Sequence, residues 1–202
     1  MLLAIDIGNT NVTFGVFDGE KIKTTWRVST AIHRTADEYA HLMLSLMERQ
    51  GVTASHLKDV VICSVVPPLL ITFEQVCKSF LKKAPLIVEA GVKTGVRIDM
   101  DNPREVGPDR IVNAVAAHQL YGGPVIVIDM GTATTFDVVS KDGRYIGGAI
   151  APGINLIGTS SSCMSCSPSK PRSPSGMRRT TRSPASRRRP RSPRTAQTFD
   201  LV

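Results

Sequence analysis

The sequence predicts an α/β protein of two related lobes, of which the second is incomplete. Three observations predict this fold. The segments IDIG, residues 5–8, and IDMG, residues 128–131, each end an apolar run with the same turn. Each is followed by two further strand-like runs, and helical patterns lie between the two copies. After Leu156 the apolar periodicity stops. Such repetition indicates a duplicated lobe, and ligands usually bind between lobes of this kind.

The first lobe, residues 1–118, is expected to begin with three strands. Residues 2–7 are an apolar run that ends at a Gly-Asn turn, which is typical of a buried strand. Two more runs flank Asp18-Gly19, a strong hairpin signal. Later in the lobe, residues 59–66 and 84–90 predict two further strands.

Helices are expected between these strands. Thr35 and Glu38 form a capping box, so an amphipathic helix should follow and end near Arg49. Pro67 and Pro68 suit the first turn of a second helix, which is expected to continue through Phe80.

Residues 91–108 are rich in Gly, Asp, Asn and Pro and predict a loop. A third helix should follow and end at Gly122. Its apolar residues Ile111, Val115 and Leu120 fall roughly on one face.

The second lobe, residues 119–156, is expected to supply three strands. The first, residues 124–130, is apolar almost throughout, as expected for a strand covered on both faces. Two more strand-like runs end near Gly153, which repeats the plan of the N-terminus.

Residues 157–202 are rich in Ser, Pro and Arg and predict a disordered tail. This tail carries a charge of about +9 and the whole chain +8, so residues 1–156 are close to neutral. Our leading interpretation is translation out of frame from about residue 157. The alternative is a natural basic tail that neutralises nucleic-acid phosphates. The tail lacks interleaved aromatic residues for base stacking, so nucleic acid is not the expected partner.

No apolar run reaches about 18 residues and no secretory signal precedes the first strand. We therefore expect a cytoplasmic protein without a membrane partner.

The two Asp-x-Gly turns are the first candidate site. Each exposes backbone N–H groups, and Gly8 or Gly131 lets the backbone approach a ligand closely, which suits phosphate. The carboxylates of Asp6 and Asp129 would repel bare phosphate, so each is expected to act through a cation. The alternative is that both are ordinary hairpin turns, and the duplication argues against it.

A second candidate site is Gly107-Pro108-Asp109-Arg110, at the start of the third helix. The helix dipole favours the ionised carboxylate of Asp109. By local sequence alone, Asp109 could instead merely cap the helix while Arg110 is solvated.

The paired turns resemble those of the actin-like superfamily, in which two ribonuclease-H-like lobes hold ATP between two phosphate-binding hairpins. The ordered segments DIGNTN, NPREVGPDR, IDMGTATTFD and GGAIAPGINL closely resemble those of type III pantothenate kinases, over residues 1–156. The resemblance implies ATP-dependent phosphorylation of pantothenate to 4′-phosphopantothenate, the first step of coenzyme A synthesis. The alternative is a non-catalytic actin-like ATP-binding protein with a basic nucleic-acid-binding tail.

The resemblance also implies roles for particular residues. Asp109 would be the general base, and Asp129 would hold potassium or ammonium, with magnesium accompanying ATP. The implied pantothenate-binding residues are Met100, Gly107, Pro108, Asp109 and Arg110. The implied ATP-binding residues are Asp6, Ile7, Gly8, Asn9, Thr10, Asn11, Val12, Thr13 and Thr132.

Three further expectations come with the resemblance. Met100 stands where family members often have Tyr, and it would supply only apolar contact. Family members form homodimers. They also continue after Leu156 with a helix that covers the second sheet and with a late substrate-binding Thr. Because neither is recognisable here, the chain as written is expected to be inactive and incompletely packed.

Overall fold

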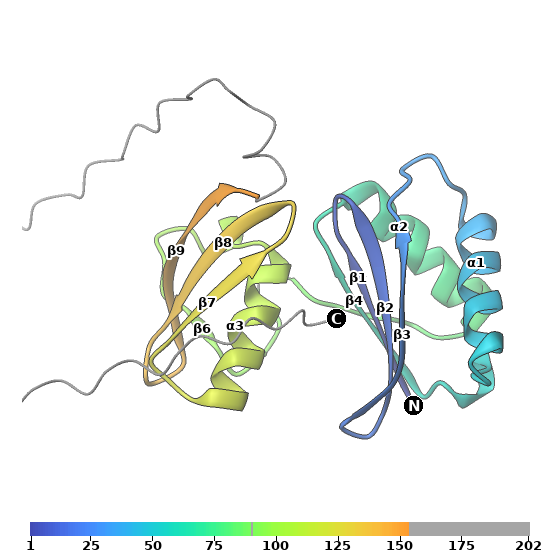
Figure 1. Ribbon diagram of the computed structural model, residues 1–202, viewed down its shortest axis with the longest axis horizontal. Coiled ribbons are helices and arrows are strands. Elements are labelled where there is room, and N and C mark those ends of the chain that lie inside the picture. The colour runs from blue at the N-terminus through green and yellow to red at the C-terminus, as the bar shows by residue number, and fades with distance from the viewer. Residues whose placement is uncertain (90, 154–202) are drawn as a thin grey trace, which may run out of the picture.

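The computed structural model describes residues 1–89 and 91–153, so the predicted tail lies outside the described residues. Two β-sheets lie side by side, each with helical cover (Figure 1). The helices α1 and α2 cover the outer face of the first sheet, and α3 packs against strands of both sheets. The predicted α/β class with two lobes is confirmed.

The first sheet has the strand order β3-β2-β1-β4-β5. The three N-terminal strands form the predicted antiparallel meander, and the last two run parallel to β1. Only two residues of the strand predicted over 84–90 pair with β4. The bounds are β1 Leu2–Ile7, β2 Asn11–Asp18, β3 Lys21–Ser29, β4 Asp59–Ser64 and β5 Leu86–Ile87.

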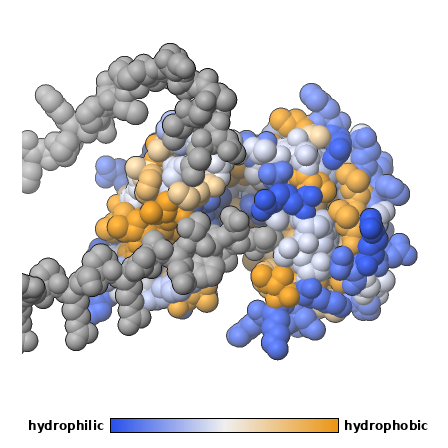
Figure 2. All heavy atoms as spheres, in the orientation of Figure 1, coloured by the Kyte–Doolittle hydropathy of each residue, from blue (hydrophilic) through white to orange (hydrophobic). Residues whose placement is uncertain are grey.

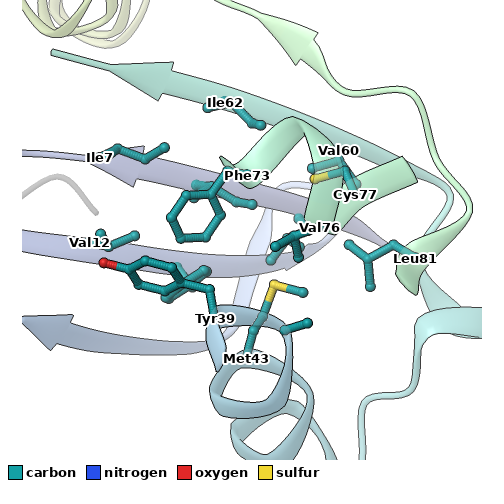
Figure 3. Close-up of a cluster of buried hydrophobic side chains, with 14 of the residues drawn as sticks. Ile7, Val12, Tyr39, Met43, Val60, Ile62, Phe73, Val76, Cys77 and Leu81 are labelled. Carbon is teal, nitrogen blue, oxygen red and sulfur yellow. The ribbon is translucent and has the colours of Figure 1, made fainter. Parts of the chain in front are cut away.

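Two helices close the core of the first lobe. The predicted capping box of Thr35 and Glu38 begins α1, Ala36–Arg49. The helix α2, Pro67–Val76, continues as a π-helical turn over Cys77–Leu81, and a short 3-10 turn spans Ala54–His56. Figure 3 shows how side chains of both helices meet those of the sheet, with Tyr39, Met43, Phe73, Val76, Ile7 and Val12 in one cluster.

The second sheet has the strand order β6-β9-β8-β7. Its bounds are β6 Arg97–Ile98, β7 Val125–Met130, β8 Ala133–Val139 and β9 Arg144–Pro152. The helix α3, Pro108–Tyr121, packs on β7 and β8 and also reaches β4. The segment predicted as a loop, residues 91–108, contains β6 and a 3-10 turn over Pro103–Glu105, because residues far along the chain in β9 pair with it.

The predicted duplication is confirmed in detail. The meander β1-β2-β3 is repeated as β7-β8-β9, with antiparallel pairing throughout. Asp6 is the fifth residue of β1, and Asp129 is the fifth residue of β7. Each middle strand also carries a register irregularity after its sixth residue, at Val16 and at Val138. Two meanders with the same bulge position indicate a common origin of the two lobes.

The second lobe leaves several apolar side chains exposed. Leu120 is 66% exposed, because α3 buries the small side chains of Ala114 and Ala117 beside Ile111 instead. The described residues cover β7 on one face only, since Ile126 is 58% exposed and Met130 is 52% exposed. This agrees with the expected incomplete packing of the second lobe. Figure 2 shows hydrophobic surface on the second lobe accordingly. None of the helices in the described part of the chain has the length and apolar composition needed to cross a bilayer.

Candidate active site

The tips of the two predicted phosphate-binding hairpins meet. The turn between β1 and β2 and the turn between β7 and β8 lie against each other, and the hydroxyl oxygens of Thr10 and Thr132 are 2.7 Å apart. These two residues are 122 positions apart in the chain. The structure therefore brings together the two turns that the sequence analysis singled out.

The first turn is held from two sides. Within the turn, the N–H of Gly8 donates to the carbonyl of Asn11 at 2.9 Å. From the end of β3, the Thr30 hydroxyl donates to the carbonyl of Gly8 at 2.7 Å, and the Thr30 N–H donates to the carbonyl of Thr10 at 2.9 Å. Thr30 was not predicted, and it fixes the backbone of this turn.

The ATP-binding stretch predicted over residues 6–13 divides into two sets of side chains. Ile7 and Val12 are fully buried in the core of the first lobe, so only their backbone groups are available to a ligand. Asp6, Asn9 and Thr10 are exposed on the opposite side, toward the second hairpin.

Three carboxylates lie near one another at this site: Asp6 on β1, Asp109 on α3 and Asp129 on β7. Loss of hydration, and then the negative charges of Asp109 and Asp129, raise the pKa of Asp6 to about 6. The Asp6 side chain still touches solvent, but the surrounding protein displaces much of its water. A hydrogen bond with Cys63, its neighbour on β4, and the positive charge of Arg27 oppose this rise.

Asp109 stands in the first turn of α3. Gly107 is the N-cap residue and Pro108 follows it, as the sequence predicts. The Asp109 carboxylate accepts a hydrogen bond from the N–H of Arg110 at 2.8 Å. A Cβ on Gly107 would lie 2.5 Å from Oδ1 of Asp109, so a larger residue there would displace this carboxylate from its present position. Asp109 therefore contributes to the helix start while remaining at the site.

Arg110 is not solvated, so the alternative of a solvated arginine at the helix start is wrong. Its Nε donates to Oδ1 of Asp137 at 2.7 Å, and its Nη2 lies 2.6 Å from the same oxygen. Asp137 is fully buried on β8, and the Arg110 side chain is only 14% exposed. The hydroxyl of Tyr145 on β9 donates to the same carboxylate at 2.6 Å. Burial and the Asp137 charge raise the pKa of Tyr145, so this hydroxyl keeps its proton.

A pocket of about 490 Å³ adjoins the start of α3. Pro108 and Val106 line it on one side, and residues of the first lobe line the other. Its polar lining includes Ser64 at the end of β4, Glu89 and Arg104. Met100 lies in the bend after β6, partly exposed, ahead of the turn that carries Arg104.

Residues 2–160 match the family model for type III pantothenate kinases. This chain belongs to the type III pantothenate kinase family. It is similar to the type III pantothenate kinase of Dehalococcoides mccartyi strain 195, with 59% identity over 76% of this chain. The enzyme of Moorella thermoacetica is 51% identical over 77% of this chain. The chain covers 59% and 61% of the length of these two relatives. The resemblance drawn from the ordered motifs is confirmed.

Within this family framework, three residues at the site were missed by the sequence analysis. Asn113 of α3 donates to Oδ2 of Asp129 at 3.1 Å and so orients a carboxylate of the second hairpin. Asp137 holds Arg110, and Thr30 holds the first turn. The segment IDMGTATTFD ends at Asp137, but nothing local indicates that its partner lies 27 positions earlier.

The donor set fits the divalent cation that accompanies ATP in a kinase. Carboxylate oxygens are ligands that magnesium prefers over nitrogen or sulfur. In residues 1–89 and 91–153, no three acidic, His or Cys side chains stand close enough to enclose a metal ion by themselves. Magnesium at this site would therefore keep water and phosphate oxygens among its ligands, as it usually does with nucleotides.

Proposed function

We propose that this site transfers the γ-phosphoryl group of ATP to the primary hydroxyl of pantothenate and forms 4′-phosphopantothenate. The observation that carries the proposal is the meeting of the two duplicated hairpins beside Asp109, in a chain of the pantothenate kinase family. Phosphoryl transfer depends mostly on positioning and on neutralising charge. Two facing turns suit the positioning of the phosphates, and cations held by the aspartates suit the neutralisation of charge.

In this proposal Asp109 orients the acceptor hydroxyl and takes its proton late in the reaction. A carboxylate is far too weak a base to ionise an alcohol beforehand, so its effect is that of a general base in the transition state. The pocket beside Pro108 is the proposed place for pantothenate, because it is lined by Pro108, the residue before Asp109, and offers both apolar walls and polar groups. Arg110 would then act from a fixed position, since Asp137 holds its guanidinium.

The cation roles belong to the same proposal. Asp129 is proposed to hold potassium or ammonium, because it occupies in the second hairpin the place of Asp6 in the first. Homodimer formation and a cytoplasmic location are carried over from the family resemblance. The expected lack of activity in the chain as written is likewise part of the proposal.

The test compares two proteins. One is the 202-residue chain, and the other is a chimera in which residues 154–202 are replaced by the corresponding C-terminal part of the Dehalococcoides enzyme. Each is incubated with magnesium, ATP, potassium and pantothenate, and 4′-phosphopantothenate is measured by mass spectrometry. The chimera should form product, and Asp109→Asn should lower its turnover at least about 100-fold with little change in ATP binding.

A matched control is Asp142→Asn, which removes one carboxylate from a turn away from the hairpins and should leave turnover unchanged. Replacing potassium by sodium should abolish most of the activity if Asp129 holds the monovalent ion. A folded chimera that forms no product contradicts the proposed reaction. Near-normal turnover of Asp109→Asn removes that residue as the base, and equal rates in the two salts remove the role of Asp129.

A further inference from the structure

The first sheet carries a row of polar side chains at the level of the first hairpin. The strand registers place Asp6 of β1 beside Cys63 of β4 on one side and beside Thr13 of β2 on the other. Thr13 in turn lies beside Arg27 of β3. Side chains alternate between the two faces of a sheet, and the neighbours Ile7 and Val12 point into the core. The row therefore lies on the face of the first sheet opposite the core, and Figure 1 shows the second lobe on that side.

Arg27 is the last residue of this row, and a hydrogen bond to its neighbour Thr13 orients its side chain. Its Nε donates to the Thr13 hydroxyl oxygen at 3.3 Å. Its positive charge also favours the ionised form of Asp6, so the guanidinium acts on the carboxylate at the mouth of the first turn. The alternative is an ordinary solvated arginine on an edge strand, but such a residue would not be held beside the turn that faces Thr132.

Arg27 also differs from the other arginines near the site in its lack of a carboxylate partner. Arg110 is paired with Asp137, and Arg144 is paired with Asp99 and Asp142. In the part of the chain that the structure describes, no carboxylate oxygen lies within 4.0 Å of a guanidinium nitrogen of Arg27. Arg27 is an exposed residue, and its bond to Thr13 uses Nε, so that bond does not occupy the terminal nitrogens.

We infer that Arg27 binds the phosphate chain of the nucleotide that occupies the first hairpin. The planar fork of a guanidinium matches phosphate oxygens, and charge-assisted hydrogen bonds of this kind are among the strong ones. Three aspartates give the site negative charge, and the phosphates add more, so a fixed cation on the first lobe supplements the metal ions. This inference rests on the proposed ATP site but does not depend on which acceptor is phosphorylated.

The experiment measures nucleotide binding by isothermal titration calorimetry with the full 202-residue chain. Arg27→Gln should weaken the binding of MgATP about 10-fold or more, the usual size of a lost charge-assisted hydrogen bond. Adenosine has no phosphates, so its binding should change less than about 2-fold. Arg27→Lys should recover part of the loss, because it restores the charge without the fork. Lys21→Gln is the matched control, since it removes one positive charge from the far end of β3 and should change nothing.

Unchanged MgATP binding in Arg27→Gln overturns the inference, and so does an equal loss for ATP and adenosine, which would indicate a general disturbance. An unaltered chain that binds no MgATP overturns both the ATP site and the role of Arg27. If Arg27→Gln selectively weakens MgATP binding while the chimera forms no 4′-phosphopantothenate, the inference stands and the proposed reaction falls. If product forms but Arg27→Gln binds MgATP normally, only the inference falls.

Discussion

At the scale of single residues, the partly dehydrated carboxylate of Asp6 should lower the stability of the fold at neutral pH. Its pKa is raised to about 6, so the folded protein binds this proton more tightly than the unfolded chain, whose carboxyl has an ordinary pKa near 4. The contribution of Asp6 to the free energy of unfolding is therefore greatest below about pH 4 and falls as the pH rises through about 6.

Asp6→Asn removes the ionisable group and should make the protein more stable than the unaltered chain at pH 7 to 8. The difference should shrink as the pH approaches 4. Urea unfolding followed by circular dichroism over this pH range, without nucleotide or magnesium, measures it. Asp142→Asn is the control, because hydrogen bonds from Ser140 and Arg144 lower the pKa of Asp142 and its removal should not stabilise. A loss of stability in Asp6→Asn at pH 7 would contradict this account.

Asp137, unlike Asp6, should stabilise the fold, so its removal should lower the free energy of unfolding. Removing one partner of a buried ion pair leaves an uncompensated charge and typically costs about 3–5 kcal/mol. Asp137→Asn should therefore lower the free energy of unfolding by several kcal/mol, since it strips Arg110 of its partner. Tyr145→Phe, which removes one hydrogen bond to the same carboxylate, should cost about 1.5–3 kcal/mol.

The comparison for Asp137 is Asp99→Asn. Asp99 pairs with Arg144 at 2.9 Å, but both side chains are nearly half exposed. Exposed pairs contribute about 0–1 kcal/mol, so this variant should unfold almost as the unaltered chain does. Equal losses in Asp137→Asn and Asp99→Asn would show that burial does not set the strength of these pairs.

These residues also mark the limit of prediction from the sequence. Asp6, Asp109 and Asp129, which the structure places near one another, could be singled out because each stands in a short segment whose local pattern repeats or resembles a family motif. Thr30 and Asp137 could not, because their partners are brought to them only by the pairing of strands and the packing of α3. The bond between Thr30 and Gly8 spans 22 positions, and that between Arg110 and Asp137 spans 27.

At the scale of elements, the sequence predicted those turns and helix ends that depend on interactions between residues close in the chain. The Asp18-Gly19 hairpin, the capping box of α1 and the proline start of α2 appear where expected. The strand β6 could not be predicted, because its two residues carry no pattern and become a strand only by pairing with β9. The exposure of Leu120 could not be predicted either, since helical periodicity tells which residues share a face but not how far the partner sheet extends.

The capping box gives an element-scale prediction. The Thr35 hydroxyl accepts from the N–H of Glu38, and the Glu38 carboxylate accepts from the N–H of Thr35. Thr35→Ala leaves a helix-end N–H without its partner and should cost about 1 kcal/mol of stability. Thr72→Ala is the matched control within α2, because its hydroxyl only bonds back to the carbonyl of Pro68, a contact that does not favour the helix. Urea unfolding of the two variants should separate them; equal effects would argue against a role for the cap.

At the scale of the whole molecule, the two lobes differ in how completely their sheets are covered. In the first lobe, side chains of α1 and α2 close a continuous core over the sheet (Figure 3). In the second lobe, α3 packs on one face of β7 and β8, where Val139 and Tyr145 are buried. The opposite face carries Ile126 and Ile128, whose neighbours across β8 are Val138 and Phe136. The site therefore lies between a first lobe with a fully packed core and a second lobe whose sheet the described residues cover on one face only.

This uncovered face should make the chain associate. Ile126, Ile128, Val138 and Phe136 lie side by side on two paired strands, so their apolar surface is contiguous, and Ile126 alone is 58% exposed. Contiguous exposed apolar patches of this kind mark interaction or aggregation surfaces, whereas isolated exposed residues are ordinary. The unaltered chain should therefore bind a hydrophobic dye and show association that rises with concentration in analytical ultracentrifugation.

The double variant Ile126→Thr with Ile128→Thr should reduce both signals, because threonine keeps the β-branched shape that suits a strand while adding a polar group. The control is Ile71→Thr on α2. Ile71 is 71% exposed, more than Ile126, but it stands on a helix of the well-packed lobe and not on this face. If exposure alone drove association, Ile71→Thr would reduce it as much as the double variant does. The double variant should keep its circular dichroism spectrum. If it still associates as the unaltered chain does, the surface that drives association lies elsewhere on the molecule.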